Sequence, residues 1–109
     1  MYYIYMLRCE DNSIYTGITI DIDRRMKEHF SKDKKCAKYT LRHNAKKLEK
    51  VWKTENRVLA SKLEYHIKKL SKLQKEELIK NSNLLQELLG EKIEADKYKI
   101  YKWFVYDLQ

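Results

Sequence analysis

The sequence predicts an α+β fold, in which helices flank a small, mainly antiparallel three-stranded sheet. Near its start, two apolar stretches are separated by the turn residues "EDNS", which is the pattern of a β-hairpin. Later stretches repeat apolar residues at helical spacing. The 109 residues are 43% apolar and contain no proline, which indicates one compact unit. We expect a domain over residues 1–80 and a C-terminal extension over residues 81–109 that packs on the same unit.

The first third of the chain is expected to form the hairpin and a helix. Residues 2–9 are rich in aromatic and β-branched side chains on both faces, which favours an internal strand. Residues 14–18 resume this strand character. Asp21 then has the position of an N-cap for a helix over residues 22–30, where apolar side chains recur at every fourth residue.

The middle of the chain is expected to contain a loop and a third strand. Residues 31–47 are basic and irregular, which indicates a loop over the surface. Residues 47–55 are predicted to be a strand, with Leu48 and Trp52 on one face and Val51 on the other.

The C-terminal half is expected to be mostly helical. A helix begins at Arg57 after an Asn56 cap and breaks near Ser71, and further helical runs extend to about Gly90. The aromatic tail over residues 98–108 alternates like a strand, although a terminal helix packed on the core or on a partner is the other interpretation.

The charge of the chain indicates a polyanionic partner. Lys and Arg number 24 against 16 Asp and Glu, for a net charge of +8. Nucleic acid is the first candidate and an anionic membrane surface the second, while a basic surface that merely aids solubility is the plain alternative. The apolar N-terminus is too short to span a bilayer, and we expect no membrane partner. Cys9 and Cys36 lack the spacing of a metal or disulfide framework, so we expect a reducing compartment, the cytoplasm.

Four kinds of side chain could carry chemistry. They are the tyrosines of the hairpin, Arg25 and His29 at helical i, i+4 spacing, and Glu64 beside a buried apolar stripe. A partly shielded carboxylate needs a cation, and a metal ion or an arginine would serve. The plainer interpretation of Glu64 is a surface ion pair with Lys68, and of the tyrosines ordinary strand aromatics in a core.

The order of these residues resembles the GIY-YIG nuclease superfamily. "Tyr3-Ile4-Tyr5", followed ten residues later by "Tyr15-Thr16-Gly17", is similar to its signature. The chain is most similar to the small, stand-alone UvrC-like branch, over roughly residues 2–80. Further matches are Arg25 with His29, Lys38-Tyr39-Thr40, Glu55, Glu64 and residues 75–79.

Three positions depart from the pattern of that family. Tyr3 stands where the signature has its first glycine, and Thr16 replaces the isoleucine of the second tripeptide. Both changes are common in the small branch. Ile18 occupies a position that is lysine in some relatives, so a tyrosine pKa would have to be lowered in another way here.

The resemblance implies a metal-dependent endonuclease that hydrolyses phosphodiester bonds, with DNA favoured over RNA and DNA repair or recombination as its setting. Arg25 would stabilise charge on the phosphate, and Glu64 would bind one divalent ion, Mg²⁺ or Mn²⁺. Tyr5 is the first candidate for the general base and His29 the second. Tyr15 would position water or phosphate.

Nucleic acid would follow a basic surface around this site. Gly17 is expected to let the backbone approach the phosphate or the helix, with a simple bulge as the alternative. The other expected contacts are Lys32, Lys34, Lys35, Lys38, Tyr39 and Arg42. Two other functions stay open: a binding module with little or no cleavage, and a homodimer or protein-partner interface through residues 84–109.

The two-tyrosine site makes a demand on the hairpin. Cross-strand partners share a face, and the numbers of Tyr5 and Tyr15 have an even sum, so the loop must contain an odd number of residues. We predict a three- or five-residue loop. A two-residue turn at Asp11 and Asn12 would place the two tyrosines on opposite faces.

Overall fold

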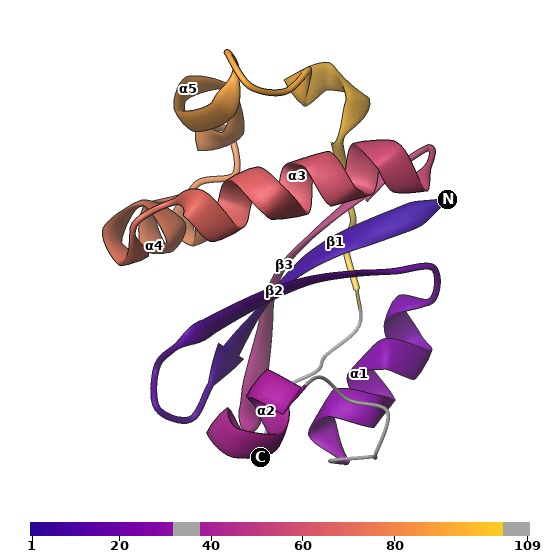
Figure 1. The fold of residues 1–109 in the computed structure, drawn as a ribbon, viewed down its shortest axis with the longest axis vertical. Coiled ribbons are helices and arrows are strands. Elements are labelled where there is room, and N and C mark those ends of the chain that lie inside the picture. The colour runs from indigo at the N-terminus through magenta and orange to yellow at the C-terminus, as the bar shows by residue number, and fades with distance from the viewer. Residues whose placement is uncertain (32–37, 104–109) are drawn as a thin grey trace.

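The fold is a four-stranded antiparallel sheet with helices on both faces, as seen in a computed structural model that describes residues 1–31 and 38–103. Figure 1 shows α3 and α4 on one side of the sheet, with α5 beyond α3, and α1 and α2 on the other side. The elements in chain order are β1 (Tyr2–Cys9), β2 (Ile14–Thr19), α1 (Ile22–Phe30), α2 (Lys38–His43), β3 (Ala45–Thr54), α3 (Arg57–Lys69), α4 (Lys72–Lys80), α5 (Leu84–Leu89), the 3₁₀ helix η1 (Ala95–Lys97) and β4 (Lys99–Ile100). The predicted α+β class is therefore confirmed, whereas the predicted three-stranded sheet gains a fourth strand, β4, at the edge beside β3.

The strand order β2-β1-β3-β4 places β1 inside the sheet, as its two apolar faces predicted. Ile4 and Met6 of β1 belong to the core beneath α3, whereas Tyr5 and Leu7 belong to the core beneath α1. Successive side chains of a strand point to opposite faces, so one strand serves both cores. β2 lies at an edge of the described sheet, beside α3.

The hairpin between β1 and β2 has the predicted three-residue loop. Tyr5 pairs with Gly17 and Leu7 with Tyr15, so Tyr5 and Tyr15 share a face. Beyond the last paired residues, Cys9 N–H donates to Ser13 at 2.9 Å and Asn12 N–H donates to Cys9 at 2.9 Å. Asn12 has φ 71°, which makes the loop a tight turn closed by a left-handed residue.

The predicted phase of the third strand is wrong. Leu48 and Val51 contact the core beneath α1, while Trp52 lies in the core beneath α3. The register between β1 and β3 shifts between Met6 and Leu7, because Met6 pairs with Lys50 and Leu7 with Leu48. An extra residue in one strand reverses the faces of every residue beyond it, and no alternation pattern reveals it.

The predicted surface loop over residues 31–47 is also partly wrong. Its described part contains α2 and the start of β3. Asn44 closes α2 with φ 51° and donates from its backbone to Thr40 at 3.1 Å. A six-residue helix is too short to be stable through propensity alone, so tertiary contacts decide its conformation.

The residues after α4 join the core beneath α3. Leu85, Leu89, Ile93 and Tyr98 are buried there together with the strand residues, and the Tyr98 hydroxyl donates to the Leu59 carbonyl at 2.6 Å. Within the described residues, the strand expected over 98–108 is limited to the two residues of β4. No helix in residues 1–31 or 38–103 has the length and apolar character needed to cross a membrane.

Replacing Thr16 by valine is expected to stabilise the fold. Thr16 is 2% exposed, and within the described residues its hydroxyl has no hydrogen-bond partner. A methyl group of similar shape removes this desolvation cost, for a gain of about 1 kcal/mol or about 4 °C in Tm. Thermal and urea unfolding measure the change. Thr19→Val is the matched control on the same strand: its hydroxyl accepts from Asp21 N–H at 3.1 Å, so its loss should destabilise. A Thr16→Val protein less stable than its parent would contradict this account.

Candidate active site

Tyr5 is the centre of the candidate site and lies against Gly17 of the neighbouring strand. A Cβ at Gly17 would lie 2.5 Å from the Tyr5 hydroxyl and 3.0 Å from Cε2 of Tyr15. Gly17 lies within β2, as the strand predicted over residues 14–18 implied, and the register from Tyr3 to Arg8 runs without a shift, so the bulge alternative is wrong. The glycine leaves room for the phenol groups.

The Tyr5 hydroxyl connects a histidine and an arginine of α1. It lies 2.7 Å from Nε2 of His29 and accepts a hydrogen bond from Nε of Arg25 at 3.4 Å. Nδ1 of His29 lies 2.8 Å from Oγ1 of Thr40 in α2. Because Arg25 can only donate, the arrangement is satisfied when Tyr5 O–H donates to Nε2 and His29 carries its proton on Nδ1.

Burial sets the protonation of this pair. Tyr5 is 1% exposed and His29 0% exposed. Burial, followed by the charge of Arg25, lowers the pKa of His29 to about 4, and burial raises the pKa of Tyr5 above its usual value. Both groups are therefore neutral near pH 7 in the free protein, which fits a Tyr5 hydroxyl that donates to a neutral imidazole.

Unfolding should reflect the lowered pKa of His29. The unfolded state binds the proton below about pH 6.5 and the folded state only below about pH 4, so the contribution is fully present above 6.5 and is lost as pH falls toward 4. The loss approaches about 3 kcal/mol. Urea unfolding across this window measures it, and a His29→Gln protein should lack this component. A parent protein of constant stability from pH 6.5 to pH 4 would refute the assignment.

Tyr15 lies between the Tyr5–His29 pair and the Glu64–Lys68 pair of α3. Its ring centroid lies 6.2 Å from that of Tyr5 and 5.7 Å from that of His29. Nζ of Lys68 lies 5.6 Å from the Tyr15 centroid and 3.4 Å from Oε2 of Glu64. The Glu64 side chain is 23% exposed, and its charge acts on the Tyr5 phenol. The Glu64–Lys68 pair foreseen as the plain interpretation is present, and it lies beside the tyrosines.

Arg25 lies at the partly open side of this cluster. Its Nη1 contacts Oε1 of Glu28 at 2.8 Å, and the Arg25 side chain is 20% exposed. A hollow nearby is lined by Arg24, Arg25 and Arg57, among others. Three guanidinium groups around one hollow give a surface suited to phosphate.

Among the predicted nucleic-acid contacts on α2, Tyr39 lies beside Tyr15. Its centroid is 5.5 Å from that of Tyr15, and its ring stacks on His43 at 4.1 Å. Lys38 and Arg42 are exposed and line a shallow hollow together with this stack. The expected contacts Lys32, Lys34 and Lys35 lie outside the described residues.

Sequence reasoning missed two participants in the cluster. The Thr40 hydroxyl is hydrogen-bonded to Nδ1 of His29, and Nζ of Lys68 lies over the Tyr15 ring. The Lys38-Tyr39-Thr40 motif predicts no separate role for Thr40, and the sequence predicts Lys68 only as a surface partner of Glu64. The i, i+4 spacing of Glu64 and Lys68 was the available signal for the lysine, whereas Thr40 depends on an unforeseen helix.

Glu64 is the carboxylate beside the tyrosines that could bind a divalent ion. Among residues 1–31 and 38–103, no group of three or more His, Cys, Asp or Glu side chains is arranged to hold a metal. The oxygen atoms of Glu64 nevertheless suit Mg²⁺ or Mn²⁺, which keep several waters and bind through one or two carboxylates together with substrate phosphate. The donor set therefore fits an ion that binds mainly together with its substrate.

The chain is similar to known proteins of one family. Residues 1–77 match the family described as the GIY-YIG catalytic domain. A UPF0213 protein of Fusobacterium nucleatum is 50% identical over 78 residues, which cover 72% of this chain and 76% of that protein. A UPF0213 protein of Clostridium perfringens is 40% identical over 88 residues, covering 80% and 91%. The solution NMR structure of a UPF0213 protein from Bacillus halodurans is 41% identical, with a TM-score of 0.47, and covers 73% of this chain and 84% of that one.

Proposed function

Because the chain belongs to the GIY-YIG family and to the UPF0213 proteins within it, we propose that it is a metal-dependent endonuclease that hydrolyses phosphodiester bonds, with DNA favoured over RNA. The observation that supports this most is the Tyr5–His29–Arg25 hydrogen-bonded group beside Tyr15 and Glu64. These side chains come from β1, β2, α1 and α3, and they include a fixed cation, titratable groups and a carboxylate.

Arg25 is proposed to stabilise the charge that develops on the phosphate. Its guanidinium remains protonated and can contact two phosphate oxygens at once. It already contacts Tyr5 and Glu28, which hold the side chain in place from two sides. A cation that is positioned before the substrate arrives needs little reorganisation during the reaction.

Tyr5 is proposed as the general base, and His29 as the group that accepts the phenolic proton of Tyr5. A water molecule would give a proton to the Tyr5 oxygen as the phenolic proton passes to Nε2 of His29, 2.7 Å away. The water oxygen then forms its bond to phosphorus while the ester bond to the leaving oxygen breaks. The charge of Arg25 stabilises negative charge on the Tyr5 oxygen during this step.

Glu64 is proposed to hold the single divalent ion, Mg²⁺ or Mn²⁺. When bound, the ion would supply positive charge to the phosphate and to the leaving oxygen. Glu64 contributes carboxylate oxygens from α3, and Lys68 keeps that side chain beside Tyr15 in the free protein.

Basic residues outside the cluster are proposed to hold the nucleic-acid backbone. The net charge of +8 provides the general attraction. Lys38 and Arg42 lie on exposed positions of α2, and Tyr39 offers an aromatic face close to Tyr15.

A cleavage assay tests the proposed function directly. The purified chain is incubated with labelled branched, single-stranded and duplex DNA and with RNA, in Mg²⁺, in Mn²⁺ and in excess EDTA. We expect metal-dependent cleavage of at least one DNA substrate and none in EDTA. Binding without cleavage on all substrates would instead support a nucleic-acid-binding module on the same fold.

A further inference from the structure

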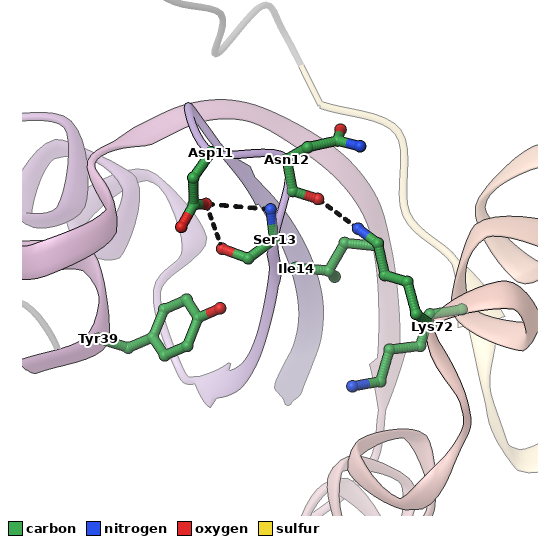
Figure 2. Close-up of a pocket in the computed structure, with 7 residues that line it drawn as sticks. Asp11, Asn12, Ser13, Ile14, Tyr39 and Lys72 are labelled. Atoms are coloured by element: carbon green, nitrogen blue, oxygen red, sulfur yellow. Dashed lines mark hydrogen bonds between the residues drawn. The ribbon is translucent and has the colours of Figure 1, made fainter.

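A hollow outside the catalytic cluster lies between the hairpin turn and α4. It is lined mainly by Asp11, Asn12, Ser13, Tyr39, Lys72 and Lys75 and has a volume of about 380 Å³. Figure 2 shows Tyr39 on one side of this lysine hollow, Lys72 on the opposite side and the turn residues between them. A water molecule in the liquid takes about 30 Å³, so a hydrated phosphate group would fit.

The walls of the lysine hollow are held firmly. Arg8 donates from Nη1 and Nη2 to the two carboxylate oxygens of Glu76, each at 2.6 Å, which fixes α4 against β1. Ser71 and Gln74 form a capping box at the start of α4. The hollow therefore exists without a ligand and needs little ordering to bind one.

Most of the charges around the lysine hollow are already paired. Nζ of Lys72 contacts Glu76 at 3.0 Å and donates to the Asn12 carbonyl. The Asp11 carboxylate accepts from the Ser13 hydroxyl at 2.5 Å and contacts His43, and these two bonds lower its pKa.

Lys75 and the Tyr39 hydroxyl differ from those paired groups. Within residues 1–31 and 38–103, Lys75 forms no ion pair and the Tyr39 hydroxyl no hydrogen bond. Figure 2 shows the Tyr39 hydroxyl directed into the hollow. Partial burial, with Lys72 and Lys68 nearby, lowers the pKa of Lys75, so an anion here would relieve an unfavourable placement of charge.

The lysine hollow lies next to the catalytic cluster. Tyr39 lines the hollow and has its ring 5.5 Å from that of Tyr15. Nζ of Lys68, whose charge acts on Lys75, lies over the Tyr15 ring at 5.6 Å from its centroid. A polyanion bound at Tyr15 would therefore extend into the hollow.

We propose that the lysine hollow binds a backbone phosphate of the nucleic acid next to the bond that is cleaved, with the Lys75 ammonium and the Tyr39 hydroxyl as donors. This inference rests on the proposed nuclease function and adds a second phosphate site to it. Lys72 contributes charge and holds the turn in place.

Salt-dependent binding in EDTA tests this site without any cleavage. The affinity of the parent, Lys75→Gln and Lys80→Gln chains for a fluorescent DNA duplex is measured between 50 and 200 mM salt. Loss of one phosphate contact lowers the slope of log K against log salt by about 0.9, so the defect of Lys75→Gln should be about threefold larger at 50 mM than at 200 mM salt. Lys80→Gln makes the same charge change at an exposed position of α4 outside the hollow and should keep the parental slope.

The outcomes separate this inference from the proposed function. A Lys75→Gln protein with the parental slope and affinity overturns the phosphate site. An equal loss of affinity and slope in Lys75→Gln and Lys80→Gln also overturns it, because the change in net charge alone would then explain the loss. A parent that binds no nucleic acid also overturns it. If the parent protein cleaves DNA but Lys75→Gln binds it like the parent, the nuclease proposal stands and the phosphate site fails. If Lys75→Gln lowers the salt slope but the parent cleaves no substrate, the phosphate site stands and the nuclease proposal fails.

Discussion

The Arg25→Ala variant is expected to bind nucleic acid and cleave it about 10²–10³-fold more slowly than the parent, the usual cost of removing one transition-state donor. Arg25 is the α1 cation that contacts the Tyr5 hydroxyl, so its loss removes charge from both the phosphate and the proposed base. Arg25→Lys should recover only part of the rate, since an ammonium cannot form the two parallel contacts of a guanidinium. Single-turnover cleavage at saturating protein measures the chemical step.

Two further measurements isolate the Arg25 effect. Lys27→Ala removes an exposed charge from the same helix and should cleave at the parental rate. Affinity for uncleaved DNA in EDTA should fall in Arg25→Ala by far less than the rate does. An Arg25→Ala protein that cleaves like the parent would remove Arg25 from the catalytic assignment.

The Glu64→Gln variant is expected to lose cleavage to a similar extent at low millimolar Mg²⁺. An amide of the same shape keeps the packing but is a much weaker ligand for a hard cation. The loss of a metal that supplies several kcal/mol corresponds to about 10²–10³-fold in rate. A metal titration should show partial recovery at high Mn²⁺, because weakened binding is overcome by concentration.

Folding and binding controls distinguish this role from the plain ion pair with Lys68. That pair is partly solvent-exposed, so Glu64→Gln should change the free energy of unfolding by no more than about 0.5 kcal/mol. DNA affinity in EDTA should be unchanged or slightly higher, since a negative charge has left a site for a polyanion. Glu87→Gln, at an exposed position of α5, is the matched control. Full activity in Glu64→Gln would return Glu64 to a structural ion pair.

Local patterns in the sequence were sufficient for most of the elements. Asp21 and Asn56 cap α1 and α3 as predicted, with side chains that accept from backbone N–H groups three residues later. Because the residue numbers of Tyr5 and Tyr15 have an even sum, a shared face required a hairpin loop with an odd number of residues, and the structure has one. Caps and turns are formed by neighbours in the chain, so they can be identified without knowledge of the fold.

The errors all lie where distant segments interact. The bulge opposite Met6 and Leu7 reverses the face of Trp52, and it depends on pairing between strands far apart in the chain. The helix α2 was missed because its conformation depends on Thr40 bonding His29 and on Tyr39 packing near Tyr15. The lysine hollow was missed for the same reason, since its walls come from the hairpin turn, α2 and α4.

The sequence by itself determined the α+β class, the hairpin geometry and the identities of the chemically capable residues, because these follow from local periodicity, turn chemistry and ordered motifs. Only the tertiary structure decided that the Tyr5 hydroxyl meets both His29 and Arg25, and that Lys68 links Glu64 to Tyr15. The protonation of His29 was likewise decided by burial, which no single segment specifies. Contacts and desolvation depend on which distant surfaces meet, and that is settled when the sheet and its two helical layers pack together.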